Sequence, residues 1–198
     1  MATGRAPRPT DDNEGRQRGT PISANLTTPE SDLEFVLADS AATEALGAAL
    51  ARTFPGAADG FAAAYLSGDL GAGKTTCVRS FLRTLGVAGL IRSPTYTLIE
   101  AYRLAALTCV HVDLYRLQGP LEVDELGLRD FLSAGCLLLV EWPDKGRGAL
   151  PAADLELALT YAGAGRRARL RSQSARGALW MRDLRCDASL ASYVSNLT

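Results

Sequence analysis

The stretch from residue 68 to residue 75 constrains this chain more than any other feature. It reads Gly-Asp-Leu-Gly-Ala-Gly-Lys-Thr and follows the pattern G-x-x-x-x-G-K-[ST]. An apolar run over 61–66 precedes it and a helical repeat of apolar residues follows it, which is the context that this pattern requires. A backbone that wraps its N–H groups round a phosphate adopts conformations that a Cβ would block, so glycines suit it. The sequence therefore predicts a phosphate-binding loop between a buried strand and a helix.

The end of this motif carries the expected chemistry. The helix that begins at Lys74 directs the positive end of its dipole at an anion, Lys74 adds a cation for the β- and γ-phosphates, and Thr75 offers a hydroxyl to Mg²⁺. A glycine-rich turn without a ligand is the alternative. Lysine occurs only at positions 74 and 145, against nineteen arginines, so its presence in the motif favours nucleotide binding.

The composition is that of a single domain with a sizeable core, with 198 residues, 47% hydrophobic and 22% charged. The net charge of −1 gives no general attraction for nucleic acid, so any RNA contact is expected to be local or through a partner. The four cysteines are far apart in the sequence and only one histidine is present, which predicts reduced, mostly buried thiols in a cytoplasmic protein. The longest apolar runs are far shorter than the ~20 residues of a membrane helix, so no membrane span is expected.

Three regions are expected along the chain. Residues 1–31 are rich in Pro, Gly, Thr, Arg and Asp and almost lack large apolar side chains, which predicts a disordered tail. A start codon assigned too early is an alternative explanation of this tail. Residues 32–184 form the expected folded domain, and residues 185–198 are a C-terminal extension of unknown role.

Hydrophobic periodicity predicts an α/β fold with a mixed parallel and antiparallel sheet flanked by helices. Two of the expected strands, 97–104 and 108–114, are joined by only a few residues, and a parallel return would need a crossover of a dozen or more, so this pair is antiparallel. The other expected strands are 33–37, 61–67, 136–140, 154–161 and 166–172, and the expected helices are 40–54, 74–85 and 120–132.

Three polar side chains lie at or near the ends of apolar strands. Glu141 follows the apolar run 136–140, where a P-loop ATPase places a carboxylate that holds Mg²⁺ opposite the loop's Thr; a solvated strand end is the alternative. His111 and Asp113 are two apart on one strand and share a face. For His111 a hydrogen-bonded structural role is favoured over catalysis, whereas a carboxylate such as Asp113 needs a partner, for example metal-bound water or an arginine.

The order of these and further motifs resembles that of the TsaE family, bacterial ATPases of tRNA threonylcarbamoyladenosine (t6A37) biosynthesis. The resemblance runs from about Leu33 to about Leu184 and implies a single P-loop NTPase-like domain over residues 32–184, with slow Mg²⁺-dependent ATP hydrolysis. It also implies that the protein acts with TsaB- and TsaD-type partners. Contact with the tRNA substrates, which read ANN codons, would then be indirect, through that complex. The motifs that carry it are Gly68-Asp-Leu-Gly-Ala-Gly-Lys-Thr-Thr76, Ser93-Pro-Thr-Tyr-Thr-Leu98, His111-Val-Asp-Leu-Tyr-Arg-Leu117, Glu125-Leu-Gly-Leu128 and Glu141-Trp-Pro143.

The resemblance assigns expected roles to single residues. It implies that Thr75 and Glu141 hold Mg²⁺, that Lys74 and Asp113 are catalytic, and that the segment 93–97 is a switch loop near the γ-phosphate. By the same resemblance, the expected ATP contacts are Leu70, Gly71, Ala72, Gly73, Lys74, Thr75 and Thr76 in the loop, with Ser40, Asp144 and Gly165 more loosely matched elsewhere.

Two other nucleotide-dependent activities are worth comparing with the ATPase. A small-molecule kinase usually carries an arginine-bearing lid, and the segments after residue 75 predict no long inserted lid, although Arg129, Arg147 and Arg166 stay candidates. A GTP-driven switch would need an Asn/Thr-Lys-x-Asp motif, which neither lysine provides. The ATPase is therefore favoured, and the kinase is the alternative.

Overall fold

The structure is a computed structural model that describes residue 1 and residues 32–193. The expected N-terminal tail lies outside the described residues, apart from Met1, and so does the segment 194–198. Within residues 32–193, none of the helices combines the length and the apolar character of a membrane span.

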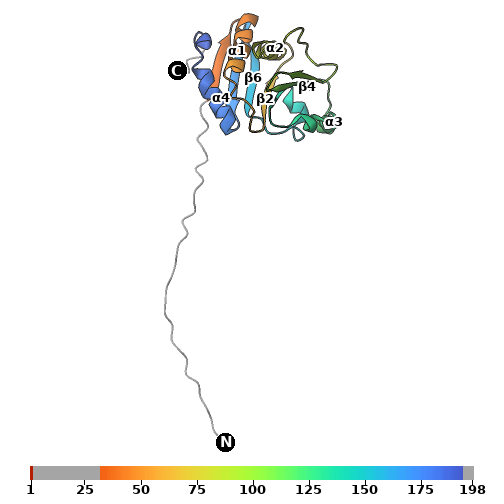
Figure 1. Cartoon of the computed structure of the whole chain (residues 1–198). Helices are drawn as coiled ribbons and strands as arrows, with labels where there is room; N and C mark the ends of the chain where they lie inside the picture. Colours follow the sequence, from red (N-terminus) through yellow and green to blue (C-terminus); the bar gives the residue numbers. More distant parts are fainter. Residues whose placement is uncertain (2–31, 194–198) are drawn as a thin grey trace.

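A seven-stranded sheet in the order β1-β7-β6-β2-β5-β4-β3 forms the centre of the fold (Figure 1). The strand that leads into the phosphate-binding loop, β2, is parallel to both of its neighbours, β5 and β6, and β4 is parallel to β5. The pairs β1–β7, β6–β7 and β3–β4 are antiparallel, which confirms the expected mixed sheet. The strands are β1 Leu33–Leu37, β2 Phe61–Gly68, β3 Ile99–Arg103, β4 Thr108–Asp113, β5 Cys136–Glu141, β6 Leu155–Ala162 and β7 Gly165–Ser172.

Helices cover the sheet on both faces and divide the core into two clusters. The larger cluster lies under α1, α2 and α4 and contains Leu46, Phe81 and Trp180. The smaller cluster contains Val123 and Leu128 and lies under α3 and the short segment after it. The helices are α1 Ser40–Arg52, α2 Lys74–Thr84, α3 Pro120–Glu125 and α4 Ala175–Arg185, with 3₁₀ segments at Leu128–Phe131, Pro143–Gly146 and Ala188–Leu190.

The single helix expected over 120–132 is wrong. Helix α3 ends at Glu125, and Gly127 then adopts a left-handed conformation with φ 67° before a separate 3₁₀ turn. That conformation cannot continue a right-handed helix. Two elements are also shorter than expected. Helix α1 ends at Arg52, before Pro55, and strand β3 begins only at Ile99, because Leu98 has φ 64°.

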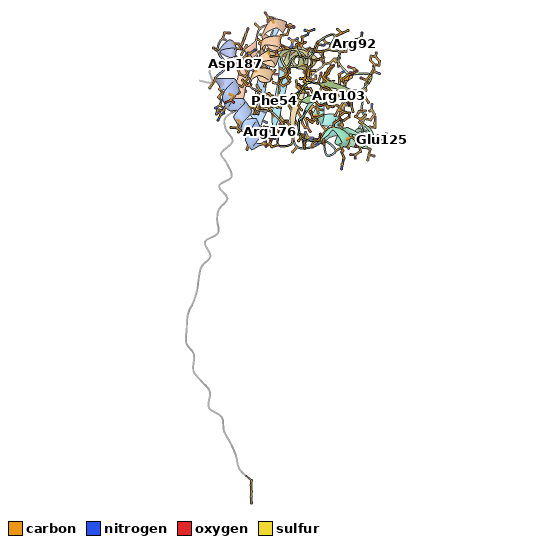
Figure 2. The ribbon with its side chains drawn as sticks, in the orientation of Figure 1. Phe54, Arg92, Arg103, Glu125, Arg176 and Asp187 are labelled. Carbon is orange, nitrogen blue, oxygen red and sulfur yellow. The ribbon has the colours of Figure 1, made fainter. Side chains whose placement is uncertain are left out.

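Helix α4 and the 3₁₀ turn after it are elements that the sequence analysis did not anticipate. Ser174 caps α4 by accepting a hydrogen bond from the Gly177 N–H, and Leu190 is buried in the larger core cluster. An ion pair of 2.9 Å joins Asp187 to Arg52 in α1; Figure 2 shows Asp187 on the side of α4, away from Glu125 in α3. The packed structure therefore continues past the boundary expected at residue 184.

Candidate nucleotide-binding site

The loop between β2 and α2 has the backbone that a phosphate-binding loop needs. Gly68, Gly71 and Gly73 have φ values of 132°, 76° and 108°, which side chains with a Cβ rarely adopt. A Cβ on Gly68 would lie 2.0 Å from the Leu159 carbonyl oxygen, so the loop also passes too close to β6 for a larger residue. Helix α2 begins at Lys74 with no side-chain cap, which leaves its first N–H groups directed at the loop's concave side.

A cavity of about 370 Å³ lies against this loop. It joins the loop to the ends of β4 and β5 and to the segment 93–95, so residues distant in sequence meet at the carboxyl edge of the parallel strands, where open α/β sheets bind ligands. Its lining residues are Leu70, Gly71, Gly73, Lys74, Thr75, Thr76, Arg79, Ser93, Thr95, Asp113, Tyr115, Glu141 and Trp142.

Lys74 is buried within the loop. Its Nζ donates hydrogen bonds to the carbonyl oxygens of Gly68 at 2.7 Å and Asp69 at 2.9 Å, and it lies 3.8 Å from the centroid of the Trp142 ring. Burial lowers the pKa of Lys74 below its ordinary value, while the charges of nearby carboxylates oppose that shift. An anion in the cavity would favour the charged form of this side chain.

Thr75 and Glu141, the two residues predicted to hold Mg²⁺, lie in direct contact. The Thr75 hydroxyl donates to Glu141 Oε2 at 2.8 Å, and Glu141 Oε1 is 2.9 Å from His111 Nε2. Mg²⁺ prefers oxygen ligands and is usually held by one or two carboxylates together with substrate phosphates and water. A hydroxyl and a carboxylate oxygen are the types of ligand that a Mg²⁺ ion held jointly with a phosphate would use, and Mg²⁺ binding by these two residues stays a prediction.

Asp113 is buried at the cavity wall and is fixed by hydroxyl groups. Ser93 and Thr95 both donate to its Oδ2, at 2.7 and 2.9 Å, and the Tyr115 N–H donates to Oδ1 at 3.1 Å. The segment 93–95 thus gives this carboxylate hydroxyl partners, whereas the sequence predicted a metal-bound water or an arginine. His111 is fully buried behind Glu141, and its Nδ1 has no hydrogen-bond partner.

The three loosely matched residues lie outside the 370 Å³ cavity. Ser40 is the exposed first residue of α1, and Asp144 is exposed and pairs with Arg147 at 2.9 Å. Gly165 is buried at the start of β7, where a Cβ would lie 2.4 Å from the Leu37 carbonyl oxygen. Gly165 therefore packs beside the β1–α1 junction that leads to Ser40, and contact of all three with ATP stays a prediction.

Aromatic and basic residues complete the site without having been assigned a role from the sequence. Trp142 follows Glu141 and packs against Tyr115 with ring centroids 5.0 Å apart and the ring planes tilted by 47°, and both rings line the cavity. Arg79 lies one turn after Thr75 and donates from Nε to the Ile91 carbonyl oxygen at 3.0 Å. The signal for Trp142 was its place inside the Glu141-Trp-Pro143 motif, and Arg79 had no signal beyond its helical spacing from Thr75.

Fold and site together define the class of this protein. A phosphate-binding loop joins a parallel strand to a helix, and a carboxylate at the end of the adjacent parallel strand contacts the loop's Thr. These are the features of a P-loop NTPase-like domain.

Comparison with known proteins identifies the family. The family model described as "Threonylcarbamoyl adenosine biosynthesis protein TsaE" matches residues 37–169, and the chain belongs to this TsaE family. It is similar to the tRNA threonylcarbamoyladenosine biosynthesis protein TsaE of Haemophilus influenzae, with 47% identity over 97 residues, and to that of Bacillus subtilis, with 38% identity over 98 residues. These matches cover 49% and 50% of this chain and 61% of each relative.

A solved structure is similar over most of the domain. The crystal structure of YdiB from Bacillus subtilis matches with a TM-score of 0.63 at 26% sequence identity, covering 79% of this chain and 95% of YdiB. The likeness supports the P-loop fold derived above from the sheet order and the loop.

Proposed function

We propose that this chain binds ATP with Mg²⁺ in the 370 Å³ cavity and hydrolyses it slowly as part of t6A37 formation in tRNA. The observation that carries the proposal is the meeting of Lys74, Thr75, Glu141 and Asp113 around one cavity. These four residues come from α2, β5 and β4, and together they provide the groups that phosphoryl transfer to water requires. Membership of the TsaE family supports a role in the tRNA pathway.

The residues of the chain perform four functions in this proposal. The glycines of the loop let backbone N–H groups face the phosphates, and the N-terminus of α2 adds its positive end. Lys74 exchanges its two carbonyl partners for phosphate oxygens. The negative charge of these oxygens then stabilises the protonated form of its ammonium group. Thr75 and Glu141 would hold Mg²⁺, which neutralises charge on the phosphates when bound. Asp113 orients or deprotonates the attacking water.

We also propose that the chain acts with TsaB- and TsaD-type partners and meets tRNA through them. The net charge of −1 supports indirect contact with RNA, because direct binding usually requires a strongly basic surface. A cytoplasmic location is part of the same proposal. It is supported by Cys77, Cys109, Cys136 and Cys186, all of which are free thiols.

Two lysine variants provide the sharpest test of ATP binding. Lys74→Ala should abolish most of the ATP affinity measured by titration calorimetry, together with phosphate release, while the melting temperature changes little. Lys145→Ala is the matched control, because it removes the only other lysine of the chain and the same charge. Equal ATP affinity in the two folded variants would refute the proposed site. Phosphate release without any added acceptor separates the ATPase from the alternative kinase.

A further inference from the structure

The hairpin of β6 and β7 contacts the outer side of the phosphate-binding loop. The Tyr161 hydroxyl donates to the Leu70 carbonyl oxygen at 2.8 Å, and Arg166 donates from Nη2 to the Gly71 carbonyl oxygen at 3.2 Å. Two carbonyl groups of the loop are therefore held by side chains that lie more than ninety residues away in the sequence. None of the proposed catalytic tasks uses these two side chains.

The register of the hairpin explains how the two side chains reach the same loop. Tyr161 and Arg166 are directly opposite each other in the antiparallel pair, and the Arg166 guanidinium lies 4.3 Å from the centroid of the Tyr161 ring. Arg166 also donates from Nη1 to the Gly165 carbonyl oxygen at 2.9 Å. Each side chain thus restricts the other, which lowers the entropy lost when both bind the loop.

These contacts act on the N–H groups of the loop through peptide planarity. In a trans peptide the carbonyl of one residue and the N–H of the next point in opposite directions. The bond to Leu70 therefore fixes the N–H of Gly71, and the bond to Gly71 fixes the N–H of Ala72, which donates to the Asp69 carbonyl oxygen at 3.1 Å. Hydrogen bonds on both sides of a peptide also strengthen one another.

We propose that Tyr161 and Arg166 are positioning residues that form a clamp, which holds the phosphate-binding loop in its binding conformation before a nucleotide arrives. A loop with three glycines at positive φ loses much backbone entropy when it becomes ordered, and the clamp reduces that cost at the moment of binding. Its effect on nucleotide affinity rests on the proposed function, whereas its effect on the loop does not.

The clamp predicts a specific pattern of nucleotide binding. Tyr161→Phe and Arg166→Ala should each weaken ADP and ATP binding by the same factor, roughly threefold to tenfold for one lost hydrogen bond. The turnover number at saturating ATP should stay close to that of the wild type, because bound phosphates then hold the loop. The double variant should lose less than the product of the two single effects, since both side chains hold one loop. Arg166→Lys should restore only part of the loss, because an ammonium group cannot make both hydrogen bonds and stack on Tyr161.

Amide hydrogen exchange on the nucleotide-free protein tests the clamp directly. Tyr161→Phe and Arg166→Ala should both accelerate exchange in peptides that cover residues 68–76. Arg167→Ala, on the next residue of β7, and Tyr102→Phe, on β3 at the far edge of the sheet, are the matched controls and should leave this exchange unchanged.

The outcomes separate the clamp from its alternatives. Unchanged exchange in both clamp variants would overturn the proposal. The proposal would also be overturned if Tyr161→Phe bound nucleotide with wild-type affinity and Arg166→Lys did so as well, because the charge at position 166 alone would then account for the effect. Accelerated exchange in a protein that binds no nucleotide would support the clamp and refute the proposed function.

Discussion

Replacement of Asp113 by Asn separates a catalytic role from a structural one. The carboxylate is 4% exposed and accepts three hydrogen bonds, two of them at one oxygen from the hydroxyls of Ser93 and Thr95. Asparagine keeps the shape and one carbonyl oxygen, which can still accept both hydroxyls. Its amide group would then face the Tyr115 N–H, which now donates to the second oxygen, so that bond is lost and two donors oppose each other.

The magnitude follows from this single lost acceptor. A fully buried donor without a partner costs about 1–3 kcal/mol, and the bond from the Tyr115 N–H is only part-buried, so the cost should lie near the low end of that range. A domain of this size loses about 2–4 °C in melting temperature per kcal/mol. The effect on turnover should be larger, because loss of a group that orients or deprotonates water reduces hydrolysis by roughly tenfold to a thousandfold. ATP affinity should stay near normal, since Lys74 and the loop hold the phosphates.

Three measurements on one preparation decide between the roles: the melting temperature, ATP affinity by calorimetry, and phosphate release per folded molecule. Ser93→Ala is the control, because it removes one anchor of the segment 93–95 and leaves the charge of Asp113 in place. A lower melting temperature with wild-type hydrolysis by the folded fraction would refute a role of Asp113 in turnover. If Ser93→Ala lost as much activity, order in the segment and not the carboxylate would be responsible.

Three further predictions follow from the site and the core. Thr75→Ala and Glu141→Gln should each weaken the Mg²⁺ dependence of hydrolysis, and their combined effect should be less than multiplicative because both are proposed to hold one ion; a fully multiplicative loss would contradict a shared site. Burial holds the pKa of Lys74 below its ordinary value, so ATP should bind with proton uptake at alkaline pH and the ATP affinity should fall as the pH rises. The Lys74→Arg variant should show neither effect, because arginine stays charged. Calorimetry in buffers of different ionisation enthalpy measures the proton uptake. Cys186 is the one exposed thiol among the described residues, and burial raises the pKa of Cys77 to about 12. Because buried thiols are inert, a thiol reagent should titrate one cysteine in the native protein and four after unfolding.

Local sequence was enough to predict the centre of this molecule. The glycines of the loop, the apolar strand before Glu141 and the two-residue spacing of His111 and Asp113 each express a constraint that acts within a few residues. Parallel strands then bring their carboxyl ends to one edge, so the meeting of Thr75 with Glu141 followed from the fold class. The break at Gly127 was missed because the apolar repeat continues across it, and periodicity does not report a left-handed φ.

Long-range contacts were beyond the reach of the same reasoning. Helix α4 is a different case, because local signals for it were present and were not used: Ser174 is a cap residue, and Trp180, Met181 and Leu184 follow Gly177 at helical spacing on one buried face. The contact of Tyr161 with Leu70 depends on the register of a hairpin and on where that hairpin ends beside the loop. Neither quantity is encoded in a short window of sequence.

Helix α4 and the β6–β7 hairpin both help to hold the phosphate-binding loop and the helix after it in place. A loop rich in glycine cannot hold its own shape, so its precision must come from rigid neighbours. On the helical side, Trp180 of α4 is fully buried and donates to the Leu50 carbonyl oxygen at 2.9 Å, and α1 approaches α2 so closely that a Cβ on Gly47 would lie 2.3 Å from the Cys77 carbonyl oxygen. Helix α2 therefore cannot move without displacing α1 and α4. On the strand side, Tyr161 and Arg166 hold the middle of the loop at Leu70 and Gly71, so the loop and the helix after it are each held by neighbours that supply none of the four residues proposed to act on the phosphates, the Mg²⁺ ion or the attacking water.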